Sequence, residues 1–213
     1  MNNLETIAEQ ILENLEAKNA AREEVLGLSR QIIQHASRAI RAAHRRDWDE
    51  ADSIMRDAGD LAEKMHKIGA DFPDILTAGY SRDALKELAE AHITRAIILE
   101  DPLPTPIELN VNDAAWLNGL GEAAGEMRRH ALDYIRRGEV MEAERLLNAM
   151  QEIYSILSTV DFPGAITSNL RRTNDMVRGV TERTRGDLTT AVRQEQMKQA
   201  LRDFEAKIGD VST

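Results

Sequence analysis

The fold class is clearest in residues 85–97, which read Leu-Lys-Glu-Leu-Ala-Glu-Ala-His-Ile-Thr-Arg-Ala-Ile. The apolar residues Leu85, Leu88, Ile93 and Ile97 recur at helical spacing and therefore form one line along a helix. Similar lines recur elsewhere in the chain, and the helix-favouring residues Ala, Leu, Glu, Arg and Ile dominate its composition. We therefore predict an all-α protein, a single-domain bundle of six to seven helices spanning residues 1–213.

Breakers in the sequence predict where these helices begin and end. Stretches 69–74 and 161–164 and the Pro-rich connector 101–106 interrupt the apolar lines. We also expect a break near Gly186. The expected helices cover residues 3–45, 49–68, 81–100, 112–137, 139–159, 164–184 and 186–207, with Ser81 as an N-cap.

One helical hairpin is used twice in this pattern. In both places a helix ends in two arginines, turns, and returns as a helix that stops at Asp-Phe-Pro. The first copy leads from Arg45-Arg46 to Asp71-Phe-Pro73, and the second from Arg136-Arg137 to Asp161-Phe-Pro163. The lengths do not match a 34-residue repeat, which makes a solenoid a poor interpretation.

Composition limits the function classes. The chain contains no cysteine, which excludes disulfides and thiolate chemistry. We expect no signal peptide, no bilayer-spanning segment and no membrane partner, and hence a cytoplasmic protein. The net charge of -10 by itself argues against nucleic-acid binding, because phosphate contacts need Lys and Arg. The arginines nevertheless cluster, either as solvated helix faces or as backbone contacts for a nucleic acid.

Four glutamates form the most informative constellation. Glu87 and Glu90 share one predicted helix, and Glu122 and Glu126 share another, each pair three or four residues apart. Converging carboxylates repel one another unless a cation neutralises them, and they suit a hard divalent ion such as Mg²⁺. The alternative is that these glutamates lie on solvent-exposed helix faces. Three glycines beside the second pair predict close approach of a helix or ligand: Gly119, Gly121 and Gly125.

These features occur in segments that resemble the translin family, which includes translin and translin-associated factor X. The resemblance rests on Arg22-Glu-Glu-Val-Leu-Gly-Leu-Ser-Arg30, on Trp116-Leu-Asn-Gly-Leu-Gly-Glu-Ala-Ala-Gly-Glu-Met-Arg-Arg129 and on residues 162–186. It covers essentially the whole chain. It implies a seven-helix fold, a closed homo-oligomeric shell expected to be an octamer, and binding of single-stranded RNA or DNA.

The branch represented by factor X implies a Mg²⁺-dependent endoribonuclease, with Mn²⁺ or Ca²⁺ as substitutes for the ion. By motif, the family's catalytic and metal-binding carboxylates match Glu87, Glu90, Glu122 and Glu126. The family has Asp at the position of Glu122. Of the nucleic-acid-binding segment that translin carries ahead of the first pair, this chain keeps only Tyr80 and Arg82.

We therefore predict a metal-dependent endoribonuclease that acts on single-stranded RNA inside an oligomeric shell. Residues expected to contact the nucleic acid are Arg129, Arg38, Arg41, Arg45, Arg171, Arg172 and Arg178. Two alternatives remain open: a shell that binds single-stranded RNA or DNA without cleaving it, and a helical protein-interaction scaffold. The scaffold predicts no salt-dependent affinity for RNA.

Overall fold

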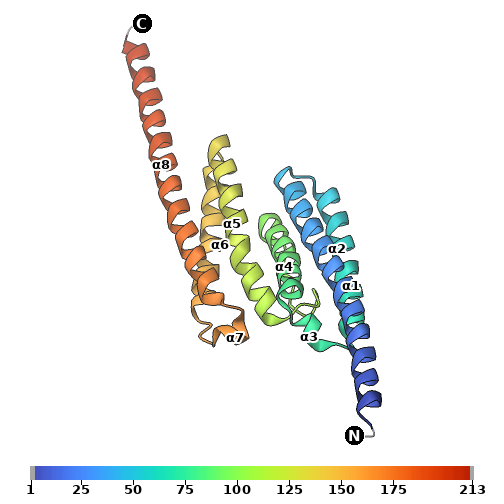
Figure 1. Ribbon diagram of the computed structural model, residues 1–213. Coiled ribbons are helices and arrows are strands. Elements are labelled where there is room, and N and C mark those ends of the chain that lie inside the picture. The colour runs from blue at the N-terminus through green and yellow to red at the C-terminus, as the bar shows by residue number, and fades with distance from the viewer. Residues whose placement is uncertain (1–2, 212–213) are drawn as a thin grey trace. The chain divides into compact units, whose positions relative to one another are not determined.

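The structure is a computed structural model that describes residues 3–211, with side chains described up to residue 207. Within these residues it is all-α, as predicted, and contains no strand. Eight helices follow one another along residues 3–211 (Figure 1): α1 (Leu4–His44), α2 (Trp48–Gly69), α3 (Pro73–Leu76), α4 (Gly79–Leu99), α5 (Asp113–Arg137), α6 (Val140–Ser158), α7 (Gly164–Thr167) and α8 (Leu170–Val211).

The last helix differs from the prediction. We expected two helices broken near Gly186, but α8 runs without interruption through this residue. A glycine inside a helix costs only about 1 kcal/mol relative to alanine, which a helix of this length tolerates. The break lies instead at Ser168 and Asn169, which adopt φ of 52° and 61° and separate the one-turn helix α7 from α8.

The predicted N-cap at Ser81 is also wrong, because α4 begins two residues earlier at Gly79. Ser81 is buried, and its hydroxyl donates to the carbonyl oxygen of Ile75 at 2.8 Å. The serine therefore ties the one-turn helix α3 to the start of α4. Pro73 occupies the first position of α3, where its missing N–H costs no helical hydrogen bond.

The chain divides into two compact units. One contains the residues up to Leu120 together with Pro163–Leu170, and the other contains Gly121–Phe162 and α8 from Arg171 onwards. Helix α5 passes through both. The prediction of a single domain therefore stays a prediction. No helix within the described residues is long and apolar enough to cross a membrane.

The first unit is built on close packing of α1, α2 and α4. Its core contains many alanines, whose small side chains let helix backbones approach one another: Ala36, Ala39, Ile40, Ala42, Ala51, Ile54, Met55 and Ala91. Arg95 on α4 binds the carboxylate of Asp52 on α2 through two nitrogens and donates to Asp101 at 2.7 Å. This ion-pair network fixes the end of α4 against α2.

The second unit buries one face each of α5, α6 and α8. Its largest buried side chains are Met127, Leu146, Met150, Leu157, Leu188 and Val177. Gly121 confirms the predicted close approach, because a Cβ at this position would meet Thr173 and Leu157. Arg128 lies 2.8 Å from Asp187 and also bonds Thr184, so this arginine has a structural partner on α8.

Candidate metal centre

Helix α4 carries the first pair of glutamates on a well-anchored element. Its buried residues Leu85, Leu88 and Ile93 fix its rotation about its own axis. The helix ends at Leu99, and the residue that caps it, Glu100, adopts the left-handed conformation with φ of 59°. With both its rotation and its end fixed, α4 presents Glu87 half-buried and Glu90 buried at 7% exposure.

Helix α5 starts from a matching set of anchors. Asn112 precedes it and accepts a hydrogen bond from the Ala115 N–H at 2.8 Å, as an N-cap does. The indole of Trp116 donates to the carbonyl oxygen of Pro104 at 2.8 Å, which ties the helix to the Pro-rich connector. The buried side chain of Asn118 donates to the Thr167 carbonyl oxygen at 2.9 Å. These bonds hold the first two turns of α5 in place.

Gly119 allows α5 to approach α4 closely. A Cβ at this position would lie 2.9 Å from the Cβ of Ala89, the backbone nitrogen of Glu90 and the carbonyl oxygen of Lys86. Only glycine fits such an approach of backbone to backbone, so this part of the glycine prediction is confirmed. Gly125 does not fit the prediction, because a Cβ there would meet nothing within 4 Å.

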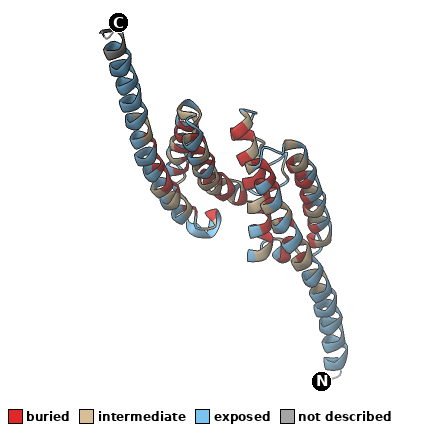
Figure 2. Ribbon diagram, turned by 90° about the horizontal axis from the view of Figure 1, so that it is seen from above, coloured by how far each residue is buried: buried red, intermediate tan, exposed pale blue. Residues whose placement is uncertain are grey.

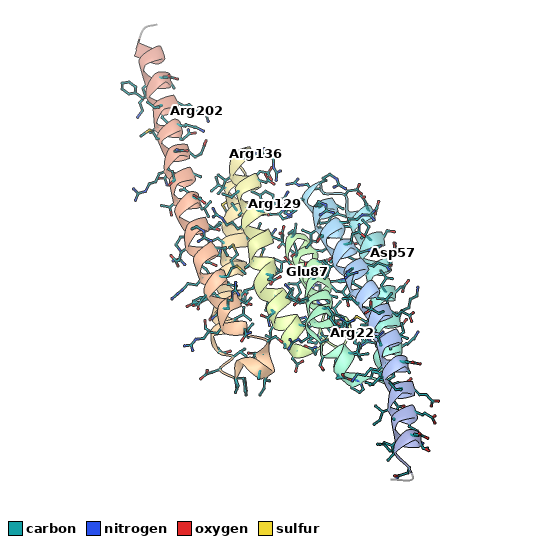
Figure 3. All side chains as sticks on the ribbon, in the orientation of Figure 1. Arg22, Asp57, Glu87, Arg129, Arg136 and Arg202 are labelled. Atoms are coloured by element: carbon teal, nitrogen blue, oxygen red, sulfur yellow. The ribbon has the colours of Figure 1, made fainter. Side chains whose placement is uncertain are left out.

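Glu122 follows Gly119 by one turn of the same helix, so the close approach at Gly119 carries its side chain towards α4. Glu87, Glu90 and Glu122 each offer one carboxylate oxygen, and these oxygens lie within 4.8 Å of one another. Figure 3 labels Glu87 on α4. Three of the four predicted glutamates therefore form one cluster. Glu126, one turn further along α5, lies outside this group and is half-buried.

The donor set of the cluster fits a divalent cation. Carboxylate oxygens are the ligands that Mg²⁺ and Ca²⁺ prefer, and burial of Glu90 makes an uncompensated charge there costly. The ammonium of Lys86 lies 3.2 Å from a carboxylate oxygen of Glu87. The sequence pattern did not indicate Lys86 as a neighbour of the cluster. Its position directly before Glu87 in the sequence could have indicated this contact.

The predicted nucleic-acid contacts are all exposed in the structure: Arg38, Arg41, Arg45, Arg129, Arg171, Arg172 and Arg178. Arg129 follows Glu122 by seven residues of α5 and therefore shares its helix face. Arg45 is paired with Glu50, and Arg178 lies 3.4 Å from Asp175. These two pairs match the interpretation of solvated helix faces. The role of the arginines stays a prediction.

Comparison with known proteins places this geometry in context. No family model matches the chain. A solved structure of AfC3PO in complex with duplex RNA is 34% identical, with a TM-score of 0.81, over 88% of this chain and 97% of that chain. A crystal structure of AfC3PO gives the same identity, TM-score and coverage.

Two further proteins are similar to this chain, the first in fold and the second in sequence. The structure of apo-NeC3PO shares the fold at 21% identity, with a TM-score of 0.77, over 90% of this chain and 98% of that chain. An uncharacterised protein of Methanocaldococcus jannaschii is 29% identical over 195 residues, which are 90% of this chain and 86% of that protein. The C3PO structures are translin/TRAX complexes from archaeal and fungal sources.

Proposed function

Since this chain belongs to the translin family, we propose that it binds RNA and cleaves it with a divalent metal ion held by Glu87, Glu90 and Glu122. The observation that carries the proposal is the convergence of three carboxylates from two helices within 4.8 Å. A merely structural helix pair gains nothing from placing three negative charges so close together.

Mg²⁺ is the proposed ion, with Mn²⁺ or Ca²⁺ as substitutes, and when bound it supplies Lewis-acid chemistry that activates water and offsets charge on a phosphodiester. The chain's own residues do the rest. Buried Glu90 and half-buried Glu87 provide a fixed set of negative oxygens on α4. Glu126 follows Glu122 by one turn and is proposed to complete the set or to accept a proton from water. Arg129 provides positive charge on the same face for the phosphate backbone.

The proposal that RNA is the ligand rests on a solved relative and on the family resemblance. One solved relative, AfC3PO, is described in complex with duplex RNA. The predicted substrate of this chain is single-stranded RNA, with single-stranded DNA as an alternative, inside a homo-oligomer expected to be an octamer. Exposed arginines on α1 and α8 could add backbone contacts whose affinity falls with salt. A cytoplasmic location remains part of the proposal.

The test uses purified full-length protein with end-labelled single-stranded and duplex RNA, in Mg²⁺ and in EDTA. Cleavage is expected in Mg²⁺ and not in EDTA. Glu90→Gln and Glu122→Gln keep the size of the side chain and remove its charge, so each is expected to reduce cleavage at least a hundredfold (about 2.7 kcal/mol). Binding in EDTA should change little, because the arginines remain.

The matched control is Glu152→Gln, which removes one exposed carboxylate on α6 outside the cluster. It should cleave as the unmodified protein does. RNA binding without Mg²⁺-dependent cleavage would refute the proposed nuclease activity and would support the alternative of a protein that binds RNA without cleaving it. Absence of any salt-dependent RNA affinity would refute both and favour the protein-interaction scaffold.

A further inference from the structure

Lys86 on α4 forms an ion pair with the residue that follows it in the chain. Its ammonium lies 3.2 Å from Oε1 of Glu87. Adjacent residues of a helix point about 100° apart, so their side chains do not face each other by helix geometry alone. The lysine side chain therefore has to cross the surface of α4 to bring its ammonium to Glu87.

This ion pair is also largely shielded from solvent. The side chains of Lys86 and Glu87 are 20% and 23% exposed. On α1 the neighbours Arg22 and Glu23 also form an ion pair, but their side chains are 48% and 60% exposed. The labels of Glu87 and Arg22 locate both pairs in Figure 3. Withdrawing an ammonium from water is costly unless negative charge offsets the lost hydration, so the position of Lys86 is stabilised by the carboxylate charge beside it.

The negative charge near Lys86 comes from more than one carboxylate. Glu87 belongs to the cluster with Glu90 and Glu122, whose oxygens lie within 4.8 Å of one another. Three carboxylates with one ammonium leave two negative charges, which is the charge that one divalent cation neutralises. The ammonium therefore interacts with a carboxylate that the metal ion would also use, and its charge opposes that of the ion.

We propose that Lys86 is a tethered counter-ion of the candidate metal centre, which lowers the affinity of the cluster for divalent cations and stabilises the cluster when no ion is bound. This inference rests on the proposed function and adds to it a residue that sets how tightly the ion is held. An ammonium has donors and no acceptor, so Lys86 competes with the ion for the Glu87 carboxylate and is not itself a ligand.

The test measures binding of Mn²⁺ to the purified full-length protein, with the free ion followed by electron paramagnetic resonance. Lys86→Met removes the ammonium and keeps an unbranched side chain. It is expected to bind Mn²⁺ about tenfold more tightly than the unmodified protein, because a positive charge beside the ligands is gone. Lys86→Arg keeps that charge and should change the affinity by less than about threefold. Unchanged or weaker binding in Lys86→Met would overturn the proposal.

Stability gives a second measurement. In EDTA the carboxylates of Lys86→Met repel one another without the ammonium that offsets their charge, so this variant should unfold at a lower temperature than the unmodified protein. Saturating Mn²⁺ should then raise the unfolding temperature more in Lys86→Met, because stabilisation by a ligand grows as its affinity for the folded state grows. An equal rise in both proteins would show that the ammonium and the ion do not compete.

Lys67→Met is the matched control for the loss of one ammonium. Lys67 lies 3.5 Å from a carboxylate oxygen of Glu63 on α2, and both side chains are exposed. The variant removes the same charge beside a carboxylate that is not part of the cluster. Its affinity for Mn²⁺ should therefore equal that of the unmodified protein. A gain as large as that of Lys86→Met would show an effect of net charge and overturn the assignment to Lys86.

Glu90→Gln separates failure of this inference from failure of the metal centre. If Glu90→Gln weakens Mn²⁺ binding while Lys86→Met does not strengthen it, the metal centre stands and the counter-ion is refuted. If neither the unmodified protein nor Lys86→Met binds Mn²⁺, the metal centre and the counter-ion are both refuted. Binding that is measurable only in Lys86→Met and is lost in Lys86→Met/Glu90→Gln would support both.

Discussion

Helices α4 and α8 occupy the same place in two similar runs of the chain, but they are buried to different extents. Each run has a long helix, a returning helix, an Asp-Phe-Pro segment and a one-turn helix before it: α1 to α3 precede α4, and α5 to α7 precede α8. Helix α4 is buried over most of its length. Among the side chains described up to residue 207, helix α8 is buried only in its first half, at residues such as Val177 and Leu188.

The difference follows from side-chain composition. From residue 84 to residue 99, α4 carries apolar residues on nearly every side, with Glu87, Glu90 and Arg95 among few charges. A helix that is apolar all round is stable only when it is buried all round. From residue 193 to residue 207 α8 combines charged residues with one narrow apolar row, and all these side chains are exposed (Figure 2). The same hairpin is thus followed once by a core helix and once by a helix whose later turns are exposed.

Removing a core side chain of α4 is expected to give the largest effect. Leu88 is 1% exposed, so Leu88→Ala leaves a cavity and should lower the free energy of unfolding by about 2–5 kcal/mol. Leu201→Ala on α8 should change it by less than about 0.5 kcal/mol. The measurement is urea denaturation at a protein concentration where the chain is monomeric. Comparable losses in the two variants would contradict the contrast between the helices.

Two glycines on α5 sharpen the comparison, because only one of them touches α4. Gly119→Ala places a Cβ against α4 backbone atoms and should cost about 1–3 kcal/mol of unfolding free energy. Gly125→Ala meets nothing within 4 Å and should gain about 0.5–1 kcal/mol by favouring the helix. Both values come from the same denaturation experiment. A gain from Gly119→Ala would show that α4 and α5 are not held together at this residue.

The two hairpin turns close in the same way but with different residues. Arg46 and Gly138 both have positive φ, 62° and 78°, and the next residue in each turn donates to a carbonyl oxygen five residues back. A left-handed conformation costs a residue with a Cβ about 1 kcal/mol. Arg46→Gly should therefore raise the free energy of unfolding, and Gly138→Ala should lower it, each by about 1 kcal/mol. Equal signs for the two changes would contradict this account.

Much of the fold could be predicted because it depends on local sequence. The long helices follow the period of their apolar residues, and the stops at Asp-Phe-Pro follow from the constraints of proline. The continuity of α8 through Gly186 could not be predicted from this residue alone. A single glycine weakens a helix but does not end it, and whether the helix ends there depends on the residues on either side. Here the left-handed residues Ser168 and Asn169 supply the break earlier in the chain.

The candidate site was predictable to the level of spacing. Two pairs of glutamates on helices indicated a cluster, and three of the four carboxylates meet. The spacing could not predict which of the four carboxylates lies outside the cluster. That depends on the rotation of α5 about its own axis once Gly119 contacts α4. The sequence also could not distinguish Gly125 from Gly119. Both are glycines on α5, but a Cβ at Gly125 would meet nothing within 4 Å.

Helices α4 and α8 also differ in the ionisable groups near their buried residues. The buried positions of α8 named above are aliphatic, whereas α4 places His92 half-buried between its core residues and the Arg95–Asp52 pair. Burial lowers the pKa of His92, and the positive charge of Arg95 lowers it further, while Asp52 acts in the opposite direction. The folded protein therefore holds this imidazole neutral at pH values where the unfolded chain already binds a proton.

It follows that acid should destabilise the protein through His92. Above the ordinary histidine pKa of 6.5 both states are neutral at this site and its contribution is zero. As the pH falls below 6.5 the unfolded chain takes up the proton first, so the free energy of unfolding declines until the folded His92 is protonated as well. Urea midpoints at pH 7.5 and pH 5.5 should therefore differ more for the unmodified protein than for His92→Gln. Equal differences for both proteins would show that His92 binds its proton as readily in the core of the first unit as in the unfolded chain.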